Sequence, residues 1–504
     1  MTLVNVCGPG QPEPQFGTKA SQTDIVHGVP QVPNNSSSWL DLNTIYSVNS
    51  TQSAALRTGS LGRLLTFDYV DVTTDPGAKF NFFGLFPPDP TAPYSCIDCP
   101  PSWGQTNGVV SVPPLLDPAL VQPGGQVFQP NQVFVSGDPR VGENGALSMF
   151  HTLFIRNHNR HAGLVHTKHP SWTDEEIFQE ARRVNIAEYQ NIVIYQYLPS
   201  EFGHYFAAYV GDYDGYNPEV DADTNVAFAT GAFRYGHSTI HNYVPYDACA
   251  NPTLFNYPAP PGVNLFEAAQ TGGVITPIDV FGEIGSFENV IRGLVNTIGA
   301  PVDIFIDDVL RNIPFGFPAG GTDLMALDLH RGRENGLANY VRLQEVYGLP
   351  SGRIYGSPGC PEWLERSNAA DPIACFRKLI PYNDTLMNAV ASLYGKVNNI
   401  DGFVGLLLEP HVQGTSFPAT MGRIIADTYK RVRDGDRFWF ENPFQVHPFS
   451  ESELNRIHSV TMGDLLRLNF NFPSSRQVPD NPYLRPAGYT DTLQDSGSCH
   501  SHGK

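Results

Sequence analysis

The sequence predicts a mainly α-helical protein that folds as one large domain with long loops and little β-structure. From residue 145 onward, apolar residues recur over many segments with the period of a helix face. Strand patterns are short and scattered, and 47 Gly and 43 Pro residues indicate many ordered loops. A chain of 504 residues with 41% hydrophobic content can bury a sizeable core.

The first part of the chain shows no clear periodicity. Residues 1–36 are polar and rich in Pro and Gly, so we expect an irregular N-terminal segment there. It contains neither a basic n-region nor an apolar h-region, and no secretory signal peptide is visible. Residues 72–135 predict a second long irregular segment that is interrupted by pairs of prolines.

Two long helices are expected next. Over 147–165, apolar residues and histidines follow the i, i+3, i+4, i+7 spacing of one helix face. The following helix opens with Thr173 and Glu176, which have the spacing of a capping box, and it continues to Pro199.

Further helical patterns continue through the C-terminal half of the chain. We expect the main domain to span 37–472 and a loose polar tail to follow at 473–504. The additional helices are predicted at 226–242, 286–297, 323–330, 337–347, 385–397 and 417–434.

Composition excludes two classes of partner. The net charge is −19 and no basic stripe is present, which argues against nucleic acid. No apolar run reaches the ~18 residues of a membrane span, so no transmembrane segment is predicted.

Two short clusters carry the strongest chemical signal. The first is the run FRYGH at 233–237, which places His237 at the end of an apolar stretch rich in small residues. A lone histidine of this kind is more often a core residue than a ligand. The second cluster, GDPRVGE at 137–143, offers Arg140 and Glu143 on a glycine-rich turn before a long helix. Together they predict the two sides of a haem pocket, because imidazole is a good iron ligand.

Further motifs in the same order resemble the animal haem peroxidase family, which includes myeloperoxidase, lactoperoxidase and peroxidasin. The resemblance covers roughly residues 37–470. It implies a helical haem peroxidase fold around haem b, oxidation of a small donor by hydrogen peroxide, and an extracellular location. The matching stretches are 140–143, 151–160, 197–199, 233–237, 328–337, 399–410 and 433–442.

On one side of the haem, the resemblance assigns four residues. His237 resembles the proximal ligand of the iron, and Asp328 falls where many members carry an Asn that accepts the imidazole N–H. A carboxylate there pushes the ligand towards imidazolate and lowers the reduction potential of the iron. Arg234 and Arg331 resemble partners of the haem propionates, which a guanidinium can pair bidentately.

On the other side, Arg140 resembles the distal arginine, the catalytic group whose charge stabilises peroxide as its O–O bond breaks. Glu143 matches the carboxylate that forms an ester with a haem methyl in several members. Asn144 stands where myeloperoxidase has a haem-linked Met, so we expect that linkage to be absent.

The run SSWLDLN at 37–43 resembles the calcium loop of the family. Its ligands would be Ser37, the Trp39 carbonyl, Asp41 and Asn43. Alternating oxygen donors around one carboxylate suit a hard cation. A turn held by Asp and Ser side chains at the start of a helix explains the same residues equally well.

The distal histidine is the main departure from the family pattern. Members carry it in an Asp-His-Asp-type motif well upstream of the calcium loop, and no such motif is present here. His27 has the wrong spacing and neighbours for this role. We therefore expect that the chain lacks the N-terminal segment that holds the distal base.

Particular residues bear on three other functions. Fatty-acid dioxygenases of the same superfamily carry a radical-forming Tyr three residues before the proximal histidine, where this chain has Arg234. A non-catalytic haem-binding or adhesion protein is favoured by the missing distal base. A metal site among the histidines around His151 and His158 lacks an H-E-x-x-H motif, and His158 is expected to form hydrogen bonds within the helix bundle.

Overall fold

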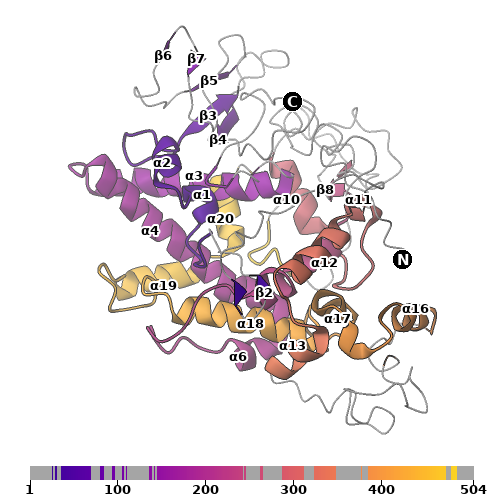
Figure 1. Cartoon of the computed structure of the whole chain (residues 1–504). Helices are drawn as coiled ribbons and strands as arrows, with labels where there is room; N and C mark the ends of the chain where they lie inside the picture. The colour runs from indigo at the N-terminus through magenta and orange to yellow at the C-terminus, as the bar shows by residue number, and fades with distance from the viewer. Residues whose placement is uncertain are drawn as a thin grey trace.

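The computed structural model describes a mainly helical domain, as the sequence predicts (Figure 1). Its regular elements crowd into the segments from residue 145 onward. The described residues are 25–26, 29–30, 36–69, 80–83, 94–96, 105–106, 109–110, 136–138, 141, 145–241, 243–245, 262–264, 287–311, 323–347, 376, 384–470, 472 and 478–484.

The helical elements include short 3-10 and π segments, which are labelled η. They are α1 (Asn43–Tyr46), α2 (Ser50–Ala55), α3 (Gly145–Lys168), α4 (Asp174–Ile192), η4 (Val193–Tyr197), α5 (Leu198–Phe202), η5 (Gly203–Tyr205), α6 (Phe206–Tyr209), α7 (Val226–Ala229), η6 (Ala232–Tyr235), α8 (Gly236–Thr239), α10 (Phe287–Asn296), α11 (Asp308–Arg311), α12 (Leu324–Glu334), α13 (Tyr340–Val346), α16 (Asp384–Tyr394), η9 (Val397–Asn399), α17 (Gly402–Leu408), α18 (Ala419–Asp434), α19 (Glu451–Ser459) and α20 (Met462–Asn469).

The strands are short and antiparallel, in agreement with the scattered strand signals. Strand β3 pairs with both β4 and β5, and β1–β2, β6–β7 and β8–β9 form separate two-stranded pairs. Their bounds are β1 (Ile25–Val26), β2 (Val29–Pro30), β3 (Thr66–Tyr69), β4 (Phe80–Phe83), β5 (Tyr94–Cys96), β6 (Gln105–Thr106), β7 (Val109–Val110), β8 (Tyr243–Pro245) and β9 (Gly262–Asn264).

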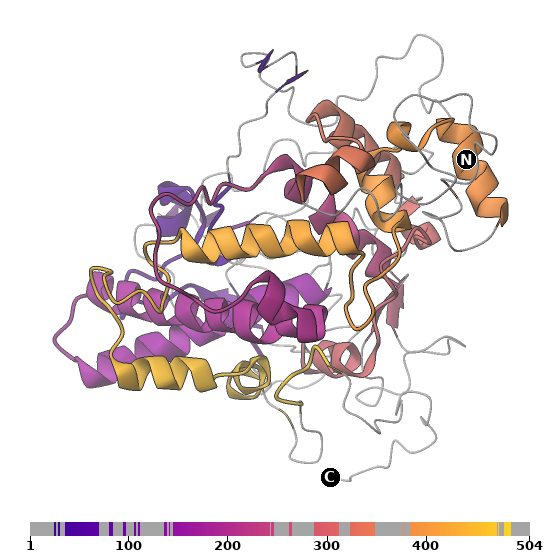
Figure 2. The ribbon, with the colours of Figure 1, turned by 90° about the horizontal axis from the view of Figure 1, so that it is seen from below.

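Helices α3 and α4 form the centre of the domain. One face of α3 packs against α4, α10 and α20 through buried side chains such as Leu153 and Phe154. Figure 2 shows α18 on one side of the α3–α4 pair and α19 on the other. The capping box predicted at Thr173 and Glu176 is confirmed, and it fixes the first turn of α4.

Two predicted elements differ from the structure. The helix expected at 226–242 is three short turns, because the chain bends at Gly231 and becomes extended at Ile240. Residues 478–484, assigned to a loose tail, instead pack on the domain. There Val478 is buried in the α3 core, and its carbonyl accepts a hydrogen bond from Arg467 of α20 at 2.5 Å.

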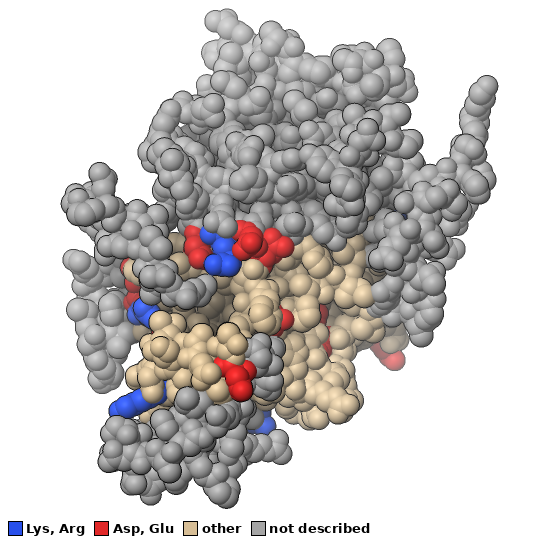
Figure 3. Space-filling model, turned by 90° about the vertical axis from the view of Figure 1, so that its right-hand side faces the viewer, with Lys and Arg blue, Asp and Glu red and all other residues tan. Residues whose placement is uncertain are grey.

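The surface carries no dominant charge on the face shown in Figure 3. Acidic and basic side chains lie next to each other in one group there, and uncharged atoms prevail elsewhere on the described surface. Among the described residues, no helix is both long and apolar enough to cross a membrane.

Candidate haem site

The histidine singled out from the sequence pairs with a carboxylate from a distant helix. His237 lies in α8 and Asp328 lies in α12, where its side chain is 0% exposed. His237 Nδ1 is 2.5 Å from Asp328 Oδ2. Because a carboxylate only accepts hydrogen bonds, Nδ1 carries the proton and Nε2 keeps its lone pair. The pair therefore holds the tautomer that can bind a metal through Nε2.

The second oxygen of Asp328 faces an arginine. Asp328 Oδ1 is buried and has no hydrogen-bond partner among the described residues, but Arg234 Nη1 lies 3.4 Å away. Arg234 Nε also donates to the Ala229 carbonyl at 3.1 Å. This guanidinium therefore lies beside the carboxylate that orients His237, and its pairing with a haem propionate stays a prediction.

Arg331 lies one turn beyond Asp328 in α12. Residues at i and i+3 share a helix face, so the guanidinium projects from the side of α12 that meets His237. In the described part of the chain, no carboxylate pairs with Arg331, which is half-buried. The cation is thus available to an anionic group near the histidine.

The backbone before His237 bends twice and leaves open space at Gly236. The chain bends at Gly231, where φ is −126° and ψ is −93°, and a new turn starts at Gly236. A Cβ atom added at Gly236 would meet nothing within 4 Å. A histidine in the ligating tautomer, open space and nearby guanidinium groups together fit the proximal side of a haem.

The residues assigned to the distal side lie outside the described residues. This holds for Arg140 and Glu143, and also for His27. Their roles stay predictions from the sequence.

Two of the candidate calcium ligands, Ser37 and Asn43, contact the carboxylate of a third, Asp41. Ser37 Oγ donates to Asp41 Oδ2 at 2.7 Å, and the Asn43 backbone N–H donates to Asp41 Oδ1 at 3.0 Å. The Trp39 N–H donates to Ser37 Oγ at 3.2 Å. These are the hydrogen bonds of the alternative explanation, a polar turn entering α1. Calcium binding by the same oxygens stays a prediction.

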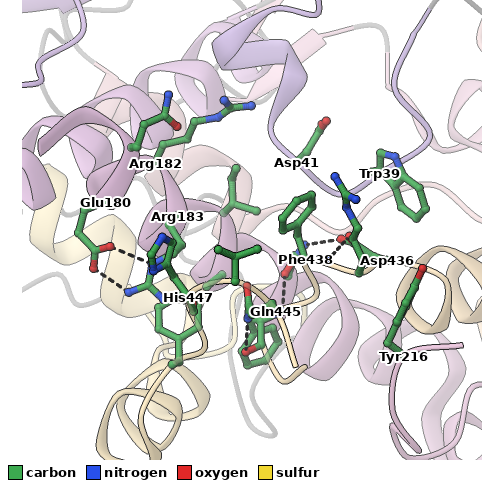
Figure 4. A pocket seen from close by; sticks show the side chains of 18 of the residues that line it. Trp39, Asp41, Glu180, Arg182, Arg183, Tyr216, Asp436, Phe438, Gln445 and His447 are labelled. Atoms are coloured by element: carbon green, nitrogen blue, oxygen red, sulfur yellow. Dashed lines mark hydrogen bonds and ion pairs between the residues drawn. The ribbon is translucent and has the colours of Figure 1, made fainter. Parts of the chain in front are cut away.

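A cavity of about 960 Å³ opens beside this turn, between α4 and residues 435–449. Figure 4 shows Asp436 at one end of it with Trp39 and Tyr216, and Asp41 nearby. Burial and the negative charge of Asp41 raise the pKa of Asp436 to about 6, against hydrogen bonds that lower it. Sequence analysis missed Asp436 as a neighbour of the loop, although it lies in the matching stretch at 433–442.

The histidines of α3 act as structural partners. His158 is fully buried between the Tyr46 hydroxyl at 2.9 Å and the Gly62 carbonyl at 2.8 Å, which confirms the expected hydrogen bonds. Burial lowers the pKa of His158 to about 3. His161 contacts Glu188 at 2.9 Å. No cluster of His, Cys, Asp or Glu that could hold a metal occurs among the described residues.

Comparison with known families shows which family the chain belongs to. The family model described as animal haem peroxidase matches residues 14–482. The chain belongs to the animal haem peroxidase family. The prediction from the ordered motifs is therefore confirmed, and the His237 and Asp328 pair lies in the part of the chain that the family model covers.

Individual members of the family and solved structures show the same relationship. Thyroid peroxidase from Sus scrofa is 31% identical over 357 residues, which are 69% of this chain and 35% of that protein. Peroxidase A from Dictyostelium discoideum has a similar structure, with a TM-score of 0.63 and 25% identity over 88% of this chain and 70% of that chain.

A fatty acid alpha-dioxygenase from Oryza sativa shares the fold, with a TM-score of 0.55 and 16% identity over 86% of this chain and 63% of that chain. This likeness shows the fold alone. The chain also spans less than two thirds of the length of the curated animal haem peroxidases it matches first.

Proposed function

We propose that this protein is a haem-dependent peroxidase that oxidises a small donor with hydrogen peroxide. The observation that carries the proposal is the pair of His237 and Asp328, in which a fully buried carboxylate leaves Nε2 as the ligand atom. Bound haem b would supply the reduction of peroxide and the one-electron oxidation of the donor.

Residues of the chain would hold and tune that group. His237 Nε2 would bind the iron, and Asp328 would keep the Nδ1 proton and lower the reduction potential. Arg331 would pair with a propionate. Arg234 would place a positive charge beside Asp328, where its Nη1 lies 3.4 Å from the carboxylate.

On the distal side, Arg140 would polarise bound peroxide, and Glu143 would form an ester with a haem methyl. The family's Asp-His-Asp motif does not occur in the 504 residues. Loss of a distal base costs a factor on the order of 10²–10⁴ in proton transfer. A second candidate function is a haem-binding or adhesion protein without catalysis, which holds if the whole protein supplies no distal base. The dioxygenase alternative is disfavoured, because this chain has Arg234 at the position where those enzymes carry the radical-forming Tyr.

Two further features belong to the same proposal. The 37–43 loop would bind calcium through its Asp41 carboxylate, and Asp436, whose pKa the charge of Asp41 helps to raise, supplies a second carboxylate nearby. An extracellular location is proposed from family membership.

Haem reconstitution tests the proposal. Purified protein supplied with haem should show a Soret band and consume hydrogen peroxide with tyramine as donor. His237→Ala should remove the band, because the iron loses its axial ligand. Asp328→Asn should keep the band and raise the reduction potential, measured by spectroelectrochemistry.

His330→Ala is the matched control, because this exposed α12 histidine pairs with Glu334 at 3.1 Å. It should leave the band unchanged. An absent band in the wild-type protein, or an unchanged band in His237→Ala, would contradict haem binding at this site. A normal band without peroxide consumption would favour the non-catalytic function.

A further inference from the structure

Two tyrosines form a hydrogen-bonded pair next to the candidate iron ligand. The Tyr235 hydroxyl contacts the Tyr197 hydroxyl, and Tyr235 lies two residues before His237. Tyr197 ends the π-helical segment η4. Such segments often occur at functional sites, and this one directs the Tyr197 side chain towards η6.

The pair continues to a third tyrosine near the surface. The ring of Tyr197 lies edge-on to the ring of Tyr483, with 5.3 Å between their centroids. The next residue, Leu484, and the nearby Asn481 line a small cavity of about 320 Å³. Gln196, which precedes Tyr197, lines the same cavity. The three phenols therefore form a chain of contacts that begins two residues before the histidine and ends at Tyr483, whose neighbours in sequence line a surface cavity.

The carboxylate of Glu201 lies close enough to both phenols to act on them electrostatically. Burial, the nearby Tyr235 and the charge of Glu201 raise the pKa of Tyr197 well above its usual range, so its phenol stays protonated. Glu201 also acts electrostatically on Tyr235. Burial raises the pKa of Glu201 itself.

We propose that Tyr235, Tyr197 and Tyr483 form a relay that carries one-electron oxidation from the haem to a second donor site at the surface. The proposal rests on the proposed haem peroxidase function. The second site would take phenolic donors attached to macromolecules, because the cavity that the neighbours of Tyr483 line opens at the surface, where a phenol on a large carrier can reach it.

Each step of the relay conserves atoms and electrons. With bound haem that hydrogen peroxide has oxidised, Tyr235 would supply one electron and would release its phenolic proton to the nearby Glu201 carboxylate. The Tyr235 phenoxyl radical then takes a hydrogen atom from the Tyr197 hydroxyl, along the hydrogen bond between them. Tyr197 regains an electron from Tyr483 and a proton from Glu201, and Tyr483 loses its proton to solvent. The donor phenol finally gives a hydrogen atom to Tyr483 and leaves as a radical.

Electron paramagnetic resonance tests the first steps. Haem-loaded protein that is frozen shortly after peroxide is added should show a tyrosyl radical, and its signal should narrow when ring-deuterated tyrosine is incorporated. Tyr235→Phe should lose this signal while its Soret band still responds to peroxide. Tyr347→Phe is the matched control, because its hydroxyl accepts a hydrogen bond from Asn225 Nδ2 at 3.2 Å and, among the described residues, forms none with the pair. It should keep the signal.

A pair of donors tests the surface site. Free tyramine and tyramine coupled to soluble dextran carry the same phenol at very different sizes. In Tyr197→Phe and Tyr483→Phe, the ratio of the dextran-tyramine rate to the free tyramine rate should fall by about tenfold. Circular dichroism and the Soret band show whether each variant is folded and loaded.

The outcomes separate the relay from the proposed function. A peroxide-responsive Soret band without a tyrosyl radical, or an unchanged donor ratio in both variants, would overturn the relay alone. A wild-type protein without a Soret band would overturn the proposed function, and the relay with it.

Discussion

Two buried carboxylates in this protein each contact a histidine, and their surroundings differ. Glu188 accepts from His161 Nε2 at 2.9 Å, Asn157 Nδ2 at 2.8 Å and Arg456 Nη1 at 2.8 Å. Asp328 has one oxygen on His237 and one without a hydrogen-bond donor among the described residues. A fully satisfied carboxylate stabilises the fold, whereas an incompletely satisfied one is more typical of a functional site.

Glu188→Gln should destabilise the protein by about 3 kcal/mol at pH 7. Burial raises the pKa of Glu188, but hydrogen bonds and the charge of His161 outweigh it and lower the pKa from 4.5 to about 2. A lowered pKa in the folded state gives stability above pH 4.5, and this stability is lost as the pH falls towards 2. Urea denaturation at several pH values measures the difference.

Glu180→Gln is the control for this change, because Glu180 pairs with Arg183 at the surface of α4, at 2.7 Å. It should cost less than about 1 kcal/mol. If Glu188→Gln cost no more than Glu180→Gln, or cost the same at pH 3 as at pH 7, the stabilising role of Glu188 would be wrong.

At the scale of elements, sequence patterns located helices better than they located helix crossings. The capping box predicted at Thr173 begins α4, and the same pattern begins α19 and α20 at Ser450 and Thr461, two helices that were not predicted. The crossing of α13 and α17 has no such local signal. There, Gly405 of α17 lies against the ring of Tyr340 in α13.

Gly405→Ala should destabilise the protein by about 1–3 kcal/mol, because the added Cβ would overlap Tyr340 and push the two helices apart. Gly163→Ala is the matched control in α3, where an added Cβ meets nothing within 4 Å. It should stabilise the protein by about 0.5–1 kcal/mol through helix propensity. Thermal unfolding measures the stability of both variants. If the two substitutions changed the stability by the same amount and in the same direction, the close crossing of α13 and α17 at Gly405 would be ruled out.

At the scale of the whole molecule, one buried arginine joins two distant segments. Arg433, near the end of α18, is 0% exposed. It donates to the carbonyls of Gly211 at 2.7 Å and Asp212 at 2.9 Å, and to the Asp434 carboxylate at 2.8 Å. The segment after α6 therefore depends on this side chain for its hydrogen bonds.

Arg433→Met should cost about 3–5 kcal/mol, because it leaves buried carbonyls and a carboxylate without their donors. Arg437→Met removes an exposed guanidinium that lies 4.5 Å from the Phe438 ring centroid, and it should change stability by less than about 0.5 kcal/mol. Limited proteolysis should also cleave Arg433→Met faster near residue 211. A protein that tolerates both changes equally would show that Arg433 does not hold this segment.

By itself, the sequence determined the helical class, the helices at 147–165 and 417–434, the family, and the identities of His237 and Asp328 as candidate haem residues. Periodicity, capping signals and ordered motifs are properties of neighbouring residues, so a linear sequence displays them. Only the tertiary structure decided that Arg234 lies beside Asp328 and that Tyr197 meets Tyr235. These contacts join residues 94 and 38 positions apart, and packing between helices sets such contacts.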